Sequence, residues 1–336
     1  MAKRYQFQHT NILLVDPDRY IAQAIMQNLR VLGFTRVTHV GQAQQASKVL
    51  ETMPINFMVT EWELPDKSGI DMVHEIRTSH TSPNRLLPII MLTGRGELPD
   101  VRKSRDTGIT EFVVKPFSPQ TLYSRIEQMV DNPRGFVLSE NYTGPERRRR
   151  VEPPYGVGER RNVVPAPIAD KQALKTTASG QPQIIAPSFA LKQSLGITEP
   201  LSRLITPEIL KEAQKELDNM AESSLEWIQK DVTSLRDGLA RLLQLYSVAA
   251  LESIKTAALS IKSRAGTFGY SFASDVARQL YLFLSADFIP THPHHLTVIS
   301  KHIDVMQVIF AQKITQRAGV GEELITDLQR LITMKK

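Results

Sequence analysis

Short apolar runs alternate with amphipathic stretches over the first 130 residues. The apolar runs are ILLV at 12–15, VTHV at 37–40, FMVT at 57–60, LPIIML at 87–92 and EFVV at 111–114. Uninterrupted apolar runs are typical of strands covered on both faces, and helical patterns between them are typical of parallel-sheet connections. We therefore predict a doubly wound α/β domain over residues 1–130, with a five-stranded parallel sheet.

The carboxyl ends of the predicted strands carry polar side chains. In open parallel sheets the working site lies beyond these ends. They carry Asp16, Glu61, Thr93 and Lys115. We therefore take these four residues as the first candidate site.

Residues 131–200 differ from both flanking regions. They hold nine of the chain's 20 prolines and two arginine-rich stretches, GPERRRR at 144–150 and GERR at 158–161. A composition of this kind buries little apolar surface. We predict a Pro/Arg-rich linker that is largely disordered, although the aromatic residues in FVLSENYTGPERRRR favour docking of its first part on a domain.

Residues 201–336 have apolar positions at helical spacing. Thr206 fits an N-cap with Pro207 at the first helical position, and the pattern continues to about Tyr246. A further helix runs from about 248 to 268 and stops at Gly269, and Ser271 fits the cap of the next. Two more helices follow THPH at 291–294 and AGVG at 318–321. The prediction is a separate all-α helical bundle.

Composition narrows the classes of function. The chain of 336 residues has 41% hydrophobic content, which suffices for two domains, and no cysteine, which excludes disulfides and thiolate metal sites. It has no run of 18 apolar residues, so we expect a cytoplasmic protein without a membrane span. The net charge is +6, but neither flanking domain concentrates it, so we do not expect nucleic acid as a partner.

Four segments of the first domain resemble successive signatures of a response-regulator receiver domain, a flavodoxin-like fold. They are ILLVDPDRYIAQAI, VTEWELPDKSGIDMVHEIR, PIIMLTGRG and GITEFVVKPF. The resemblance implies that an aspartate ending the third strand accepts a phosphoryl group, with Mg²⁺ held by acids after the first strand. It also implies that Thr93 and Lys115 stand where the family contacts the phosphoryl oxygens.

Three positions depart from the receiver pattern. Glu61 stands at the acceptor position, and its extra methylene displaces the carboxylate by about 1 Å, enough to cost on the order of 10²-fold in rate. Pro17 breaks the acidic pair, which leaves Asp16 as the candidate Mg²⁺ ligand, with Asp18 outside the metal shell. Phe112 occupies the aromatic switch position without a hydroxyl. We expect Glu61 to act as a fixed charge that pairs with Lys115, and we expect no cofactor.

The segment IKTAALSIKSRAGTFGYSFASDVARQL at 254–280 resembles the central helix of a histidine-containing phosphotransfer (HPt) domain. The resemblance places Leu259 at the position of the phosphorylated histidine. Helical geometry puts Lys255, Leu259, Lys262 and Gly266 on one face, beside the apolar stripe and on its wetter side. We therefore expect a docking face that cannot carry phosphate, and we do not expect His294, His295 or His302 to replace the histidine.

These features predict a degenerate phosphorelay protein rather than an enzyme. A pseudo-receiver and a pseudo-phosphotransfer bundle would bind sensor kinases, receivers or other signalling proteins without passing phosphate. Two alternatives stay open: an active response regulator with an unorthodox acceptor, and an anionic-surface or nucleic-acid binder that uses the arginine-rich linker. The sequence does not specify the oligomeric state.

Overall fold

The computed structural model describes residues 7–139, 142–147, 163–164, 183–289, 292–315 and 320–333. The chain divides into two compact units. The first holds Met1–Val114 and Pro119–Gln214, and the second holds Lys215–Lys336 with the short segment Lys115–Ser118, so the main division falls inside one long helix. The first unit is α/β and the second is all-α, as the sequence predicts.

The first unit is built on a five-stranded parallel sheet. Its strands are β1 (Asn11–Val15), β2 (Arg36–Val40), β3 (Phe57–Thr60), β4 (Ile89–Thr93) and β5 (Glu111–Val114), in the order β2-β1-β3-β4-β5. The central strands β1, β3 and β4 are buried along almost their whole length, which explains why they read as continuous apolar segments. The order reverses at β1, so the sheet is doubly wound.

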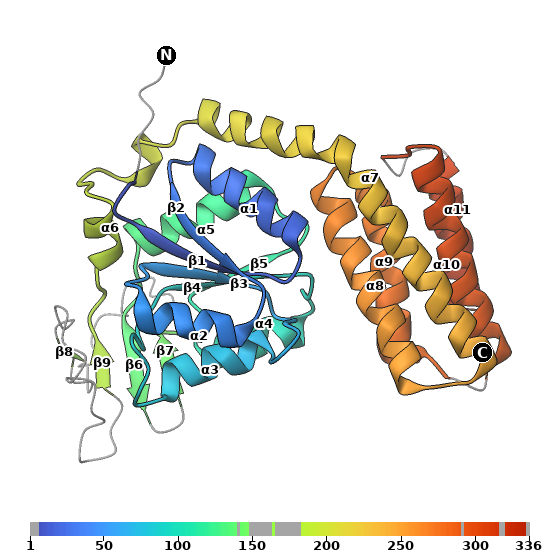
Figure 1. Ribbon diagram of the computed structural model, residues 1–336, viewed down its shortest axis with the longest axis horizontal. Coiled ribbons are helices and arrows are strands. Elements are labelled where there is room, and N and C mark those ends of the chain that lie inside the picture. Colours follow the sequence, from blue (N-terminus) through green and yellow to red (C-terminus); the bar gives the residue numbers. More distant parts are fainter. Residues whose placement is uncertain are drawn as a thin grey trace, which may run out of the picture. The chain divides into compact units, whose positions relative to one another are not determined.

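Helices cover both faces of this sheet (Figure 1). α1 (Arg19–Val31) and α5 (Pro119–Asp131) lie on one face, and α2 (Ala43–Thr52), α3 (Gly69–Thr78) and α4 (Leu98–Thr107) lie on the other. Alternate residues of each strand face opposite sides, so Leu13, Met58 and Met91 pack with α2 and α3 in one core layer.

A second sheet, antiparallel except for the parallel pair β8–β9, is built from the segment predicted to be a linker. β6 (Phe136–Ser139) pairs with β7 (Tyr142–Pro145) and with β9 (Gln183–Ile185), and β8 (Val163–Val164) adds to β9. Phe136 and Leu138, two apart in β6, point to one face and are buried with Ile185 against Leu86.

The predicted docking of the first part of this segment is seen at residues 133–139 and 142–147, and residues 183–200 are also folded rather than disordered. Arg147 lies beside Asp106, 3.5 Å away, and stacks over Tyr142. The arginines at 148–150, 160 and 161 lie outside the described residues.

The returning chain is held on α5 by one carboxylate. Asp131 accepts hydrogen bonds from Lys192 Nζ at 2.8 Å and from Leu201 N at 2.7 Å. Lys192 belongs to the short helix α6 (Ala190–Ser194), and Leu201 begins a 3-10 turn (Leu201–Arg203). A single acid thus fixes two successive elements that lie 61 and 70 residues away in the sequence.

A buried guanidinium connects α3 to three other parts of the first unit. Arg77 is 1% exposed and donates to the backbone carbonyls of Gly108, Arg85 and Leu87 at 2.7–2.9 Å. Its Cζ atom also lies 5.0 Å from the centroid of the Phe136 ring. Burial lowers the pKa of Arg77 to about 9, so the group is still charged at pH 7.

The second unit is an all-α bundle. Its helices are α7 (Pro207–Gln244), which enters from the first unit, α8 (Val248–Thr267), α9 (Ser271–Leu282), α10 (Pro293–Ala311) and α11 (Val320–Thr333). α9 continues into a π-helical turn (Phe283–Asp287). Ser271 is the first residue of α9 rather than its cap, which is Tyr270.

Two glycines fix how α7, α8 and α9 pack. Gly269 has φ 87°, a left-handed conformation that ends α8. A Cβ at Gly238 of α7 would lie 2.5 Å from Ile254 of α8, so this glycine permits close approach of the two helices. Among the described helices, none combines the length and apolar character needed to cross a bilayer.

We expect Arg77→Met to lower the free energy of unfolding of the first unit by about 2–4 kcal/mol, because three buried carbonyls lose their donor. The measurement is urea unfolding followed by Trp62 fluorescence in a Trp227→Phe background, since Trp62 lies in the first unit. Arg105→Met is the matched control, because its side chain is 53% exposed. Equal losses for the two variants would contradict a structural role for Arg77.

Candidate functional site

The four residues of the first candidate site meet at one edge of the parallel sheet. Asp16, Glu61 and Lys115 directly follow β1, β3 and β5, and Thr93 ends β4. These strands are neighbours in the sheet, so the four residues share one sheet edge, as the strand ends predict. All four are buried, with exposed fractions of 1%, 8%, 2% and 0% for Asp16, Glu61, Lys115 and Thr93.

The Glu61 carboxylate is held by its own loop. Its Oε1 atom accepts hydrogen bonds from the backbone N–H groups of Trp62, at 2.6 Å, and Glu63, at 3.4 Å. Gly69 closes this loop, because its N–H donates to Trp62 O at 2.7 Å and a Cβ there would lie 2.1 Å from Glu61 O. The carboxylate oxygen is thus engaged before any ligand arrives.

The acids after β1 serve the chain locally. Asp16 Oδ1 accepts from Asp18 N at 2.8 Å. Asp18 Oδ1 in turn accepts from Tyr20 N and Ile21 N, which makes Asp18 the N-cap of α1. The placement of Asp18 outside a metal shell agrees with its role as a cap.

These residues do not fit the Mg²⁺ site that the receiver resemblance implies. Asp16 has one oxygen in a backbone hydrogen bond, Pro17 offers no side-chain oxygen, and Glu61 is engaged by its loop. Over the ranges that the structure describes, no three His, Asp or Glu side chains gather as a metal site. A hard cation would find one acid where two are implied.

Thr93 and Arg95 close the site on the side of α4. The Thr93 hydroxyl oxygen accepts from Arg95 N at 3.2 Å, inside the loop that follows β4. The Arg95 guanidinium lies 2.6 Å from Glu63 Oε1 and 3.3 Å from Asp100 Oδ1. It therefore ties the loop after β3 to the first turn of α4.

Trp62 is the centre of this arrangement. Its side chain is 4% exposed, and its ring faces Arg95 Cζ at 5.0 Å and Lys103 Nζ at 5.5 Å. We name Trp62, Glu63, Arg95, Asp100 and Lys103 the α4 clamp. Sequence reasoning misses the clamp, because GRG at 94–96 is too short to indicate a nucleotide loop and suggests no other role. The signal present is a lone arginine between two glycines, beside the candidate site.

Phe112, a predicted residue of the receiver pocket, and Asp66, which was not predicted, both contact neighbouring elements of the fold. Phe112 is partly buried and packs against the core beneath α2 and α3. Asp66, which the sequence analysis does not single out, accepts from Ala43 N and Gln44 N at 2.9 Å and caps α2. The hydrogen bond from Gln44 is the largest cause of a lowered pKa for Asp66.

Comparison with known proteins agrees with this geometry. The family model described as the response regulator receiver domain matches residues 12–127. The chemotaxis protein CheY of Pseudomonas aeruginosa is 30% identical over 124 residues, which are 37% of this chain and 98% of that protein. The chain belongs to the response regulator receiver family. We call its first unit the receiver unit from here on, and a receiver domain implies two-component signalling.

Other relatives match the same third of the chain. The phosphate regulon transcriptional regulatory protein PhoB of Rhizobium meliloti is 31% identical over 128 residues, which are 38% of this chain and 55% of that protein. The solved structure of the chemotaxis response regulator CheY4 of Vibrio cholerae aligns at 24% identity with a TM-score of 0.33. It covers 35% of this chain and 97% of that one.

The second candidate site lies on α8 of the bundle. Leu259 and Gly266 are half-buried, and Lys255 pairs with Glu252 at 2.9 Å. Lys262 is 6% exposed. The neighbouring helix α9 approaches here, and its Ser274 Oγ donates to Lys262 O at 2.7 Å.

Arg264, which follows Lys262 on α8, forms an ion pair with a residue of α7. Arg264 Nη1 lies 2.8 Å from Asp231 Oδ2, which also accepts from Ser260 Oγ at 3.2 Å. Both charged side chains are mostly buried, with exposed fractions of 17% and 16%. Arg264 therefore joins two helices of the bundle.

The nearby histidines are not placed to accept a phosphoryl group. His295 and His302 are both 0% exposed. His295 Nδ1 accepts from Ile289 N at 2.9 Å, and His302 Nδ1 lies 2.8 Å from Val298 O. Burial lowers the pKa of His302 to about 4, against the opposing effect of the Val298 carbonyl.

We expect Arg95→Ala to speed amide hydrogen exchange about tenfold over residues 97–103, because the clamp no longer holds the first turn of α4. The measurement is hydrogen–deuterium exchange by mass spectrometry. Arg102→Ala, exposed on the same helix, is the control and is expected to leave exchange unchanged. Unchanged exchange in Arg95→Ala would show that the clamp does not stabilise α4.

We expect His302 to make the bundle less stable as the pH falls from 6.5 to about 4. In that range the unfolded chain binds a proton that buried His302 does not, so unfolding is favoured. The full effect is ~3 kcal/mol, and His302→Met should remove most of it. The measurement is chemical unfolding at pH 7.5 and pH 4.5, with exposed His80→Met as the control. Identical pH dependence in wild type and His302→Met would refute this role.

Proposed function

We propose that this chain is a cytoplasmic two-component regulator that acts by binding signalling partners and not by accepting phosphate. In this proposal it is not an enzyme and needs no cofactor. Its receiver unit would stay in one state, and sensor kinases, receivers or other signalling proteins would be its partners.

The observation that carries the proposal is the position of the Glu61 carboxylate. A phosphoacceptor needs a free oxygen aimed at the incoming phosphorus, close to a metal ion. Here Oε1 accepts two backbone hydrogen bonds from its own loop, and Pro17 stands in place of the second acid. Glu61 supplies a permanent negative charge on the sheet edge that also carries Lys115, and we propose that the two form an ion pair.

The α4 clamp supports a receiver unit held in one state. In the receiver pattern the hydroxyl at the Thr93 position is expected to contact the phosphoryl group. In this chain that oxygen accepts from Arg95 N, and Arg95 connects two loops and α4 without a ligand. The clamp therefore supplies a connection that a phosphoryl group would otherwise make.

The α8–α9 hairpin supports a pseudo-phosphotransfer role for the bundle. α8 ends at the left-handed Gly269, where the HPt pattern has its Phe-Gly turn, and Leu259 takes the histidine position. Leu259 is half-buried and cannot form a phosphoramidate. We propose that it acts as an apolar contact for a partner.

The proposal is tested first with acetyl phosphate and Mg²⁺, followed by intact mass. We expect no phosphoryl adduct on the wild type and none on Glu61→Gln. Glu61→Asp, run in parallel, shows whether the shorter side chain restores acceptance. A stoichiometric adduct on the wild type would refute the proposal and favour an active regulator with an unorthodox acceptor.

The binding half is tested with the immobilised full chain and purified sensor kinases and receivers from the same genome. We expect Leu259→Glu to weaken the binding of a captured partner 10- to 100-fold. This loss corresponds to the free energy of about 1.5–3 kcal/mol that full burial of a leucine side chain contributes. Thr256→Glu, exposed on the same helix, is the control. Failure of every signalling protein to bind the wild type would count against the proposal.

A further inference from the structure

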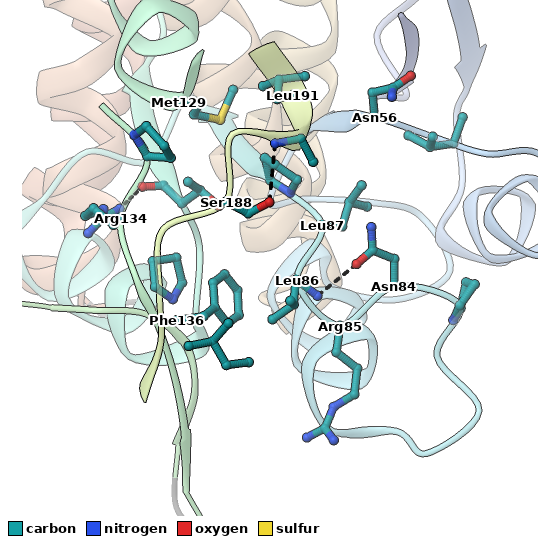
Figure 2. Close-up of a pocket in the computed structure, with 18 of the residues that line it drawn as sticks. Asn56, Asn84, Arg85, Leu86, Leu87, Met129, Arg134, Phe136, Ser188 and Leu191 are labelled. Carbon is teal, nitrogen blue, oxygen red and sulfur yellow. Dashed lines mark hydrogen bonds between the residues drawn. The ribbon is translucent and has the colours of Figure 1, made fainter. Parts of the chain in front are cut away.

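A large cavity opens in the receiver unit at the edge of the sheet where the strands begin (Figure 2). Its volume is about 1480 Å³. One wall is formed by residues 50–56 and by the loop at 80–88, which precede β3 and β4; the other wall is the chain at 185–193, which leads from β9 into α6. Glu61 and Thr93 lie at the opposite ends of the same strands, so this is a separate site.

Both walls of the cavity carry large apolar side chains among polar ones. Met53, at the end of α2, is 39% exposed, and Phe189, on the facing wall, is 50% exposed. Between them Leu86 packs against the buried side chains of Phe136 and Ile185. Large apolar side chains exposed on two facing walls are typical of a surface that a ligand covers.

The charged groups at the back of the cavity already have partners within the protein. Glu111, 7% exposed, lies 3.7 Å from Arg134 and 3.5 Å from Arg125. Arg134 also donates to the carbonyls of Thr110 and Glu146. Arg85 donates to Arg77 O and to a hydroxyl. A charged ligand would have to displace one of these interactions, so the lining favours an uncharged one.

Neutral hydrogen-bonding groups remain available on the loop wall. Asn84 Oδ1 accepts from Leu86 N, and Asn56 Oδ1 accepts from Asn11 N, so each amide is oriented with its oxygen engaged. Within the described ranges neither amide nitrogen has an acceptor, and the buried Ser82 hydroxyl has no partner. The cavity thus presents the amide N–H groups of Asn84 and Asn56 to a ligand.

We propose that this cavity binds an uncharged, elongated and largely apolar small molecule that carries a carbonyl or similar acceptor. The apolar side chains of the two walls would cover its body, and Asn84 and Asn56 would donate to its acceptor. The volume exceeds the ~300–1,000 Å³ that encloses a drug-sized molecule, which favours an extended ligand. This site is independent of the phosphoryl chemistry at Glu61.

The test is a fluorescence titration of the full chain with Nile red, an uncharged apolar dye that carries a ring carbonyl. We expect Nile red to bind one saturable site. We expect Met53→Ser and Phe189→Ser each to lower its affinity about tenfold. Leu98→Ser on α4 and Leu245→Ser in the bundle are controls, since both leucines are exposed elsewhere, at 72% and 77%. No saturable binding, or equal losses in the control variants, would overturn the proposal.

A second variant tests the proposed hydrogen bond from Asn84 to the acceptor of the ligand. Asn84→Asp keeps the oxygen that holds Leu86 N and removes the amide donor. We expect this variant to lower the affinity for Nile red more than the affinity for diphenylhexatriene, an uncharged hydrocarbon of similar length without a hydrogen-bond acceptor. Equal losses for the two dyes would refute the hydrogen-bonding part of the proposal.

Discussion

The amino edge of the receiver unit, where the parallel strands begin, depends on the hydrogen bonds of one buried guanidinium, that of Arg77. It joins the end of α3 to the cap of α4, to the loop before β4 and, through the Phe136 ring, to the added antiparallel sheet. A charge this deeply buried persists because each side of it meets a carbonyl oxygen or a ring face. The walls of the cavity are arranged around this one side chain, since Arg85, Leu87 and Phe136 all adjoin it.

The two edges of the parallel sheet have opposite characters. At the carboxyl edge the polar side chains bond to their own loops: Glu61 to the backbone after it, Asp16 to the entry of α1, Thr93 to the loop that carries Arg95. At the amino edge the chain adds a sheet and a helix and leaves a large space. Because the polar groups of the receiver's usual reactive edge already have partners, new chemistry in this chain is better sought at the other edge.

The pattern of apolar residues in the sequence was sufficient to predict every strand of the parallel sheet and the helices of the bundle. Each of these elements has a pattern that lies within its own residues. The edge residues Asp16, Glu61, Thr93 and Lys115 followed from strand ends alone. The antiparallel sheet was missed, since β6 and β9 pair across 40 or more residues and each is too short to give a pattern. Arg77 and Arg95 were missed for a related reason: an arginine in a sequence does not reveal whether carbonyls, a carboxylate or a tryptophan ring will face it.

The pairing of β6 with β9 also decides how this chain can change over time. The chain leaves this sheet after β7, returns to it at β8 and again at β9, and Asp131 then fixes α6 and the 3-10 turn beside α5. The intervening stretch therefore has both ends anchored on one surface. Closing such a loop costs only about 0.6 kcal/mol more for each doubling of its length. The closure entropy therefore sets only a small cost on a change in the length of the chain between two anchored strands, so evolution can vary that length while β6 and β9 keep their pairing.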